Sequence, residues 1–167
     1  PTKTKLLVLD AGRDNNRTSF ELPANGFAAL LESEVKKSND PNLWVLSAND
    51  VRERSHTSPS LGRSVFGKML SEGLSDKADK NSNGYIELDE LYQHVQNGVS
   101  QWVKLASSEH ETQTPILLHA DPAKLVPDQL ADCILLTASP AGTTEENTPG
   151  EDQSGIPVKD MAAEQAE

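Results

Sequence analysis

The chain has 167 residues, of which 35% are apolar and only 4% aromatic, so it can bury one core built mainly from aliphatic side chains. Its formal net charge of -11 argues against nucleic acid and anionic membrane surfaces as partners, because both need a basic face. The single cysteine, Cys133, excludes an internal disulfide and a cysteine-rich zinc site.

The start of the chain predicts alternating strands and helices. Lys5–Asp10 is a short apolar run typical of a strand buried on both faces, and Leu43–Ser47 repeats the pattern. Between them, Gly26–Lys37 places apolar residues at helical spacing. A further helix is predicted around Val65–Leu70, and Gly73 is expected to end it.

The middle of the chain continues this alternation. Asn49–Gly62 is polar and predicts a long exposed loop, of a length that is often functional. Leu88–Val103 is a strong amphipathic helix pattern, and Pro115–His119 predicts a third strand that can tolerate proline at its start. The order indicates an α/β fold with a mostly parallel sheet flanked by helices.

Composition divides the chain in two. Residues 1–136 form the expected α/β domain, whereas 137–167 carry Ser, Pro, Gly, Thr, Glu and Ala without apolar periodicity and predict a disordered acidic tail. No apolar run reaches the roughly 20 residues of a membrane span, and Leu6–Leu9 is too short for a signal peptide. We therefore expect the cytoplasm rather than secretion, and we expect the chain to be part of something longer because Pro1 almost directly precedes a strand.

Residues 79–90 have the spacing of an EF-hand-type calcium loop. Calcium takes six to eight oxygen ligands, and Gly84 permits the sharp turn that wraps the chain around the ion. The expected metal ligands are Asp79, Asn81, Asn83, the Tyr85 backbone carbonyl, Glu87 and the bidentate Glu90. Amides replace two possible carboxylates, which predicts a micromolar or weaker site.

A metal-free turn remains the alternative for this loop, because Asp, Asn and Gly also form tight turns without an ion. The residues just before it are polar, including Ser75 and Asp76, whereas apolar residues run up to an ordinary EF-hand loop. EF-hands also usually pair, and the sequence carries one copy of the motif. We therefore expect a single structural calcium site rather than a paired switch.

The order of the elements resembles the C-terminal half of a caspase-like (metacaspase-related) peptidase domain. Leu6–Arg13 resembles the strand that ends at the catalytic cysteine, and Leu43–Ala48 resembles the next strand. Gly62–Phe66 and Leu70–Leu74 resemble the following helix, and Gln113–Pro115 resembles the segment before the last strand. The resemblance covers roughly Lys5 to Leu118, and bacterial relatives of this group often carry an Asp- and Gly-rich turn between two helices. It implies a caspase-like layered fold fragment.

The resemblance also implies what is missing. Gly12 stands where the family has its nucleophilic cysteine, and the family's histidine would lie upstream, so no catalytic residue is assigned. Cys133 follows the last matching strand and is expected to be a small buried hydrophobe. The prediction is a calcium-binding, non-catalytic caspase-like domain, whose partners would be a calcium ion and either other proteins or a missing N-terminal half.

Three alternatives stay open. The chain could be a piece of an active caspase-like cysteine endopeptidase whose catalytic residues lie elsewhere. It could be a scaffold or interaction domain in which residues 79–90 form a metal-free turn. A free-standing EF-hand protein is disfavoured, because such proteins are nearly all helical and the runs Leu6–Leu9 and Leu43–Leu46 predict buried strands.

Overall fold

The computed structural model describes residues 4–11, 26–106 and 111–137. Gly12, the position expected for a nucleophile, lies outside the described residues, and so does the predicted acidic tail from residue 138 onward. Thr137, assigned to that tail, is instead the last residue of a strand.

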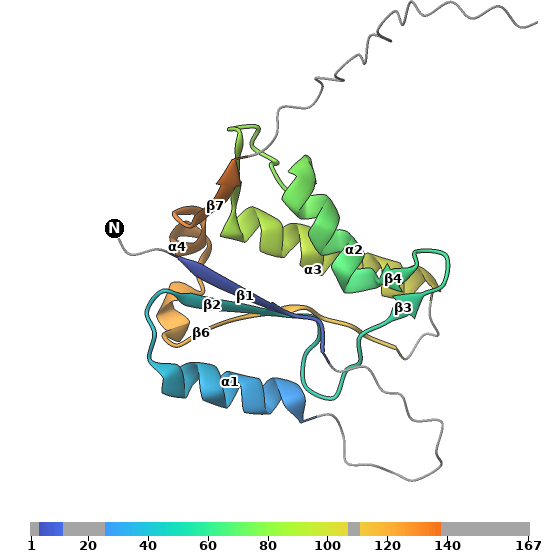
Figure 1. Ribbon diagram of the computed structural model, residues 1–167, viewed down its shortest axis with the longest axis horizontal. Coiled ribbons are helices and arrows are strands. Elements are labelled where there is room, and N and C mark those ends of the chain that lie inside the picture. The colour runs from blue at the N-terminus through green and yellow to red at the C-terminus, as the bar shows by residue number, and fades with distance from the viewer. Residues whose placement is uncertain (1–3, 12–25, 107–110, 138–167) are drawn as a thin grey trace, which may run out of the picture.

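Helices and strands alternate, as the sequence predicts, in a mixed α/β fold (Figure 1). The described elements are β1 (Lys5–Leu9), α1 (Phe27–Ser38), β2 (Leu43–Ser47), β3 (Thr57–Ser58), β4 (Arg63–Ser64), α2 (Val65–Glu72), the π-helical turn η1 (Gly73–Lys77), β5 (Tyr85–Glu87), α3 (Leu88–Ala106), β6 (Ile116–His119), the 3-10 turn η2 (Pro122–Lys124), α4 (Pro127–Ala131) and β7 (Ile134–Thr137). The expected long loop after β2 therefore contains part of a small hairpin, β3–β4.

The central sheet is mixed, which corrects the expectation of a mostly parallel one. Its order is β1-β2-β6, with β1 parallel to β2 and β6 antiparallel to β2. One helix, α1, lies between β1 and β2 in the chain. It carries the chain back to the end of the sheet where β1 began, so that β2 runs parallel to β1. Two helices, α2 and α3, run in opposite directions between β2 and β6, so the chain enters β6 the other way (Figure 1).

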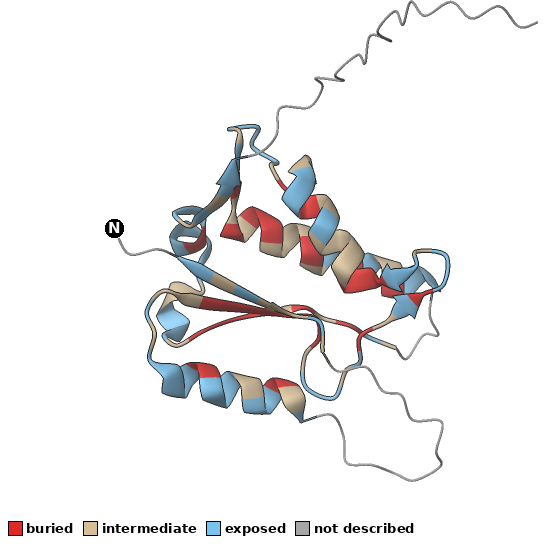
Figure 2. Ribbon diagram, viewed as in Figure 1, coloured by how far each residue is buried: buried red, intermediate tan, exposed pale blue. Residues whose placement is uncertain are grey.

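The sheet lies between α1 on one face and the pair α2–α3 on the other (Figure 1). Alternate residues of β2 serve the two sides, because Val45 packs toward α1 with Val35 and Leu118, whereas Leu46 joins the larger core. The predicted apolar stripe of α3 is confirmed, and its inward face is buried (Figure 2). Its buried members include Leu91, Val95, Val99 and Val103.

Gly73 does not end a helix by adopting a left-handed conformation. Helix α2 ends at Glu72, but Gly73 has an ordinary helical φ of -62° and the chain continues into η1. A Cβ on Gly73 would lie 2.8 Å from Leu91 Cδ1 and 3.1 Å from His94 Cδ2. Glycine is therefore needed here for the close approach of α3, just before residues 79–90.

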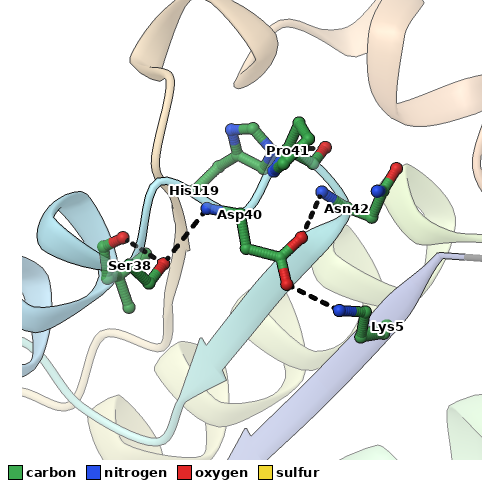
Figure 3. A network of polar contacts seen from close by, with 7 residues as sticks. Lys5, Ser38, Asp40, Pro41, Asn42 and His119 are labelled. Atoms are coloured by element: carbon green, nitrogen blue, oxygen red, sulfur yellow. Dashed lines mark hydrogen bonds and ion pairs between the residues drawn. The ribbon is translucent and has the colours of Figure 1, made fainter.

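A polar network ties the starts of β1 and β2 to the end of β6 (Figure 3). Lys5 Nζ lies 2.6 Å from Asp40 Oδ2, and Asn42 N donates to Asp40 Oδ1 at 3.0 Å. The Lys5 ammonium, and then the Asn42 amide, hold the pKa of Asp40 below its ordinary value. Nε2 of the buried His119 contacts the Pro41 carbonyl at 3.2 Å. These contacts hold together the end of the sheet at which β1 and β2 begin and β6 ends.

Candidate metal centre

Residues 79–90 follow η1 and run into α3, and their second half consists of β5 and the first three residues of α3. The loop begins as Asp79 N donates to Asp76 O at 3.0 Å, and it ends with Glu90 in the first turn of α3. Gly84 has a φ of +82°, a region that favours glycine, as predicted for the turn. Ser82 also has a positive φ, of +57°.

In the first half of the loop, side-chain oxygens accept hydrogen bonds from backbone amides of the same loop. Asp79 Oδ1 accepts from Asn83 N at 3.1 Å, and Asp79 Oδ2 accepts from Gly84 N at 3.0 Å. Asn81 Oδ1 accepts from Asn83 N at 2.9 Å, and Asn83 Oδ1 accepts from Tyr85 N at 2.8 Å. The three predicted ligand side chains at alternate positions are thus turned toward one short stretch of backbone.

Glu90 closes the loop from the helix side. Its Oε1 accepts from Lys80 N at 3.1 Å and from Asn81 N at 3.2 Å. The residue is only 7% exposed, and its Oε2 is buried with no hydrogen-bond partner among the described residues. A buried carboxylate oxygen without a partner costs free energy, because water can no longer solvate it. This open oxygen is the feature that a bound cation would satisfy.

The remaining predicted ligands lie on β5. Glu87 Oε1 accepts from Asn83 Nδ2 at 2.9 Å. Tyr85, whose backbone carbonyl is the predicted ligand, is 45% exposed. Within the described residues, no three or more His, Cys, Asp or Glu side chains gather in a group that could hold a metal. The predicted ligands combine three carboxylates with amide and carbonyl oxygens, a donor set that is typical of calcium rather than zinc.

The structure supplies a partner strand that sequence reasoning missed. β5 pairs antiparallel with β7, with Tyr85 opposite Thr137 and Glu87 opposite Ile134. Leu88 N also donates to Cys133 O at 2.9 Å. The apolar run 133–136 was the available signal, but its short length did not distinguish a core segment from a strand.

A second polar group, which we call the strand-end cluster (Asp10, Ser55, His56, Ser64, Glu111 and Gln113), lies at the carboxyl end of β1 and around the β3–β4 hairpin. Asp10 Oδ1 accepts from Ser55 Oγ at 2.8 Å, and Asp10 Oδ2 accepts from Ser64 Oγ. Ser64 also caps α2 by accepting from Gly67 N at 2.9 Å. Asp10 thus ties the end of β1 to the start of α2.

His56 is packed rather than exposed, unlike a free loop histidine. Its Nε2 lies 3.0 Å from Glu111 Oε2, and its Nδ1 lies 3.1 Å from Gln113 Oε1. Glu111 also pairs with Arg54, and the buried Gln113 donates from Nε2 to Ala48 O at 2.9 Å. These long-range contacts join the loop after β2 to the segment before β6, and the sequence carries no local signal for them.

Cys133 packs against the main core and is partly buried. Burial, and then the nearby Asp132 carboxylate, raise the pKa of its thiol above the ordinary value, which disfavours the reactive thiolate. This environment agrees with the expectation of a small hydrophobe.

No family model matches this chain, and no curated protein was found to match it. None of the helices in the described ranges is long and apolar enough to cross a membrane. The resemblance to caspase-like peptidases consequently stays a prediction from the sequence.

Proposed function

We propose that the loop of residues 79–90 binds one calcium ion. The ligands would be the side-chain oxygens of Asp79, Asn81, Asn83, Glu87 and Glu90, with the backbone carbonyl of Tyr85. The observation that carries the proposal is Glu90 Oε2, a buried carboxylate oxygen without a hydrogen-bond partner among the described residues. A cation at the loop would compensate its charge and its lost hydration.

The geometry around Glu90 supports a ligand role for its Oε2. Its Oε1 is held by the Lys80 and Asn81 amides, which orients the carboxylate and leaves Oε2 as the open position. Asp79, at the other end of the loop, is held in the same way by two backbone amides. Both end carboxylates are therefore positioned by the backbone in advance, and this lowers the ordering cost of binding.

The ion would act chiefly on stability. Asp79 follows η1 and Glu90 lies on α3, so a shared ion would clamp the connection between the two helices that cover the sheet. An ion that binds only the folded chain stabilises it by about 2.7 kcal/mol at a hundredfold excess over its dissociation constant.

We infer a non-catalytic caspase-like domain from the sequence resemblance alone. Gly12 has no side chain that could attack a carbonyl, and Cys133 packs beside the calcium loop in a setting that disfavours the thiolate. We expect no turnover of peptides with basic or acidic P1 residues. Cleavage that cysteine reagents abolish would overturn this part of the proposal.

Calcium titration tests the main proposal. We expect wild-type chain to release or absorb heat on titration in a calorimeter and to melt at a higher temperature with calcium. Glu90→Gln should abolish both effects, because the amide removes the bidentate carboxylate. Asp89→Asn is the matched control: it loses the same charge one residue away, on a carboxylate that accepts from Gln93 Nε2 at 2.7 Å. No heat from the wild type at millimolar calcium would refute calcium binding.

A further inference from the structure

The second half of the calcium loop is held in place by β7. Of the strands that the structure describes, β7 alone pairs with β5, and the two form a sheet of their own. The pairing joins Tyr85 to Thr137 and Ile86 to Leu136, with an irregularity between Ile86 and Glu87. β7 thus provides the strand contact that holds β5 in the described part of the chain.

This pairing acts directly on the proposed ligands. Tyr85 and Glu87 are β5 residues, and Glu90 follows in the first turn of α3. The Leu88 amide, between them, donates to the Cys133 carbonyl at 2.9 Å. Docking of β7 therefore orients two of the six proposed ligands, Tyr85 and Glu87, and release of β7 would leave them to be ordered by the ion itself.

β7 is anchored on one side only. Leu135 and Cys133 pack against the main core, whereas Ile134 and Leu136 are 55% and 44% exposed. A two-stranded sheet of this length is marginal in water unless other parts of the molecule support it. Docking of β7 should thus rest on a small free energy that a bound ion can change.

We propose that calcium binding at residues 79–90 and docking of β7 onto β5 are thermodynamically coupled. Calcium binding strengthens the docking of residues 133–137. Loss of that docking lowers the affinity for calcium by the same factor, because coupling between two equilibria is reciprocal. β7 is thus a part of the same chain whose docking sets the affinity of the loop for calcium. The inference rests on the proposed calcium site.

Two matched substitutions test the coupling from the side of β7. Leu135→Asn removes a core anchor, whereas Leu136→Asn makes the same chemical change at the adjacent, exposed position. Calorimetry should show calcium bound about tenfold more weakly by Leu135→Asn, within the usual range of coupling free energies. Leu136→Asn should bind within about twofold of wild type, because an exposed side chain contributes little to docking.

The reverse measurement uses the wild-type chain and is independent of how well Leu135→Asn folds. The Cys133 thiol is labelled by a disulfide reagent with and without calcium, and calcium should slow labelling about fivefold or more. Glu90→Gln is the control and should label at one rate under both conditions.

The outcomes separate the two proposals. If calorimetry shows calcium binding while the wild-type labelling rate is unchanged, the coupling is wrong and the calcium site stands. Equal calcium affinities for the two asparagine variants, both folded by circular dichroism, would also refute the coupling. If the wild type shows no heat of binding, the calcium site and the coupling are both refuted.

Discussion

Two carboxylates, Asp10 in the strand-end cluster and Glu90 in the loop of residues 79–90, are held in different ways. Asp10 is exposed, yet each of its oxygens accepts a serine hydroxyl. Glu90 is 7% exposed, yet only its Oε1 has a hydrogen-bond partner among the described residues. The cluster supplies hydrogen-bond donors to both oxygens of Asp10. In the loop, one buried oxygen of Glu90 has no donor among the described residues.

The difference indicates which region could accept a group from outside the chain. Hydroxyl donors make the strand-end cluster a self-sufficient tie between β1 and α2. In the loop of residues 79–90, backbone amides hold both oxygens of Asp79 and Oε1 of Glu90, whereas Oε2 of Glu90 has no hydrogen-bond partner among the described residues. Mutations in the strand-end cluster should change the free energy of unfolding equally with and without calcium. Mutations of the predicted ligands in the loop should change it by different amounts in the two conditions.

The largest effect is expected at Gln113 in the cluster. Gln113→Ala removes the partner of the Ala48 carbonyl and of the His56 amide, and should cost about 2–4 kcal/mol because both groups lose a hydrogen bond. Urea unfolding with and without calcium measures this, and the loss should be equal in both buffers. Gln129→Ala, at an exposed position, is the control and should change stability by less than about 0.5 kcal/mol. A calcium-dependent loss in Gln113→Ala would break the contrast between the regions.

The next largest effect, that of Glu90→Gln on the free energy of unfolding, should have opposite signs in chelator and in calcium. In chelator, Glu90→Gln should raise the free energy of unfolding by about 1–2 kcal/mol, because it removes a buried charge whose Oε2 is unpartnered among the described residues. In saturating calcium the same variant should be less stable than wild type. Paired urea curves test this, and destabilisation of equal size in both buffers would show that Glu90 is only a structural acceptor.

Ser64 should show a smaller, calcium-independent effect. Ser64→Ala removes the cap of α2, and also one hydrogen bond to Asp10, for a cost of about 1 kcal/mol. Ser71→Ala makes the same change at an exposed position of α2 and serves as the control in thermal melts. Equal melting temperatures for the two variants would argue that the Asp10–Ser64 tie contributes nothing.

The smallest expected effect is a pH dependence at His94, one turn beyond Glu90 on α3. Its Nε2 is buried without a partner in the described part of the chain. Burial is the main cause that lowers its pKa below 6.5, opposed by Glu72 and aided by Lys80 and Lys77. The unfolded chain therefore binds more protons, so the contribution of His94 to stability is complete above 6.5 and is lost as pH falls through the lower folded pKa.

Urea midpoints at about pH 7.5 and about pH 5.5, measured in chelator, test this prediction. The drop on acidification should be smaller in His94→Gln than in wild type, since glutamine does not titrate. An identical drop in both proteins would assign the pH dependence to other groups.

Local patterns predicted six of the 13 described elements, namely β1, α1, β2, α2, α3 and β6. β2 occupies Leu43–Ser47 as predicted, and α1 and α3 follow their apolar periodicity closely, because burial of one helix face leaves a repeat that is visible in sequence. The direction of β6, the β3–β4 hairpin and β7 were not foreseen. Each depends on pairing between separate segments, and short apolar runs do not encode their partner.

For the candidate site, the sequence by itself determined the types and the spacing of the predicted ligands from Asp79 to Glu90, and the turn at Gly84. Tertiary structure alone decided that Glu90 is buried with an open oxygen, and that β7 stands beside β5. The physical reason is distance along the chain. Ligand spacing is a property of twelve consecutive residues, whereas burial of Glu90 and the pairing of Glu87 with Ile134 arise only when distant segments pack together.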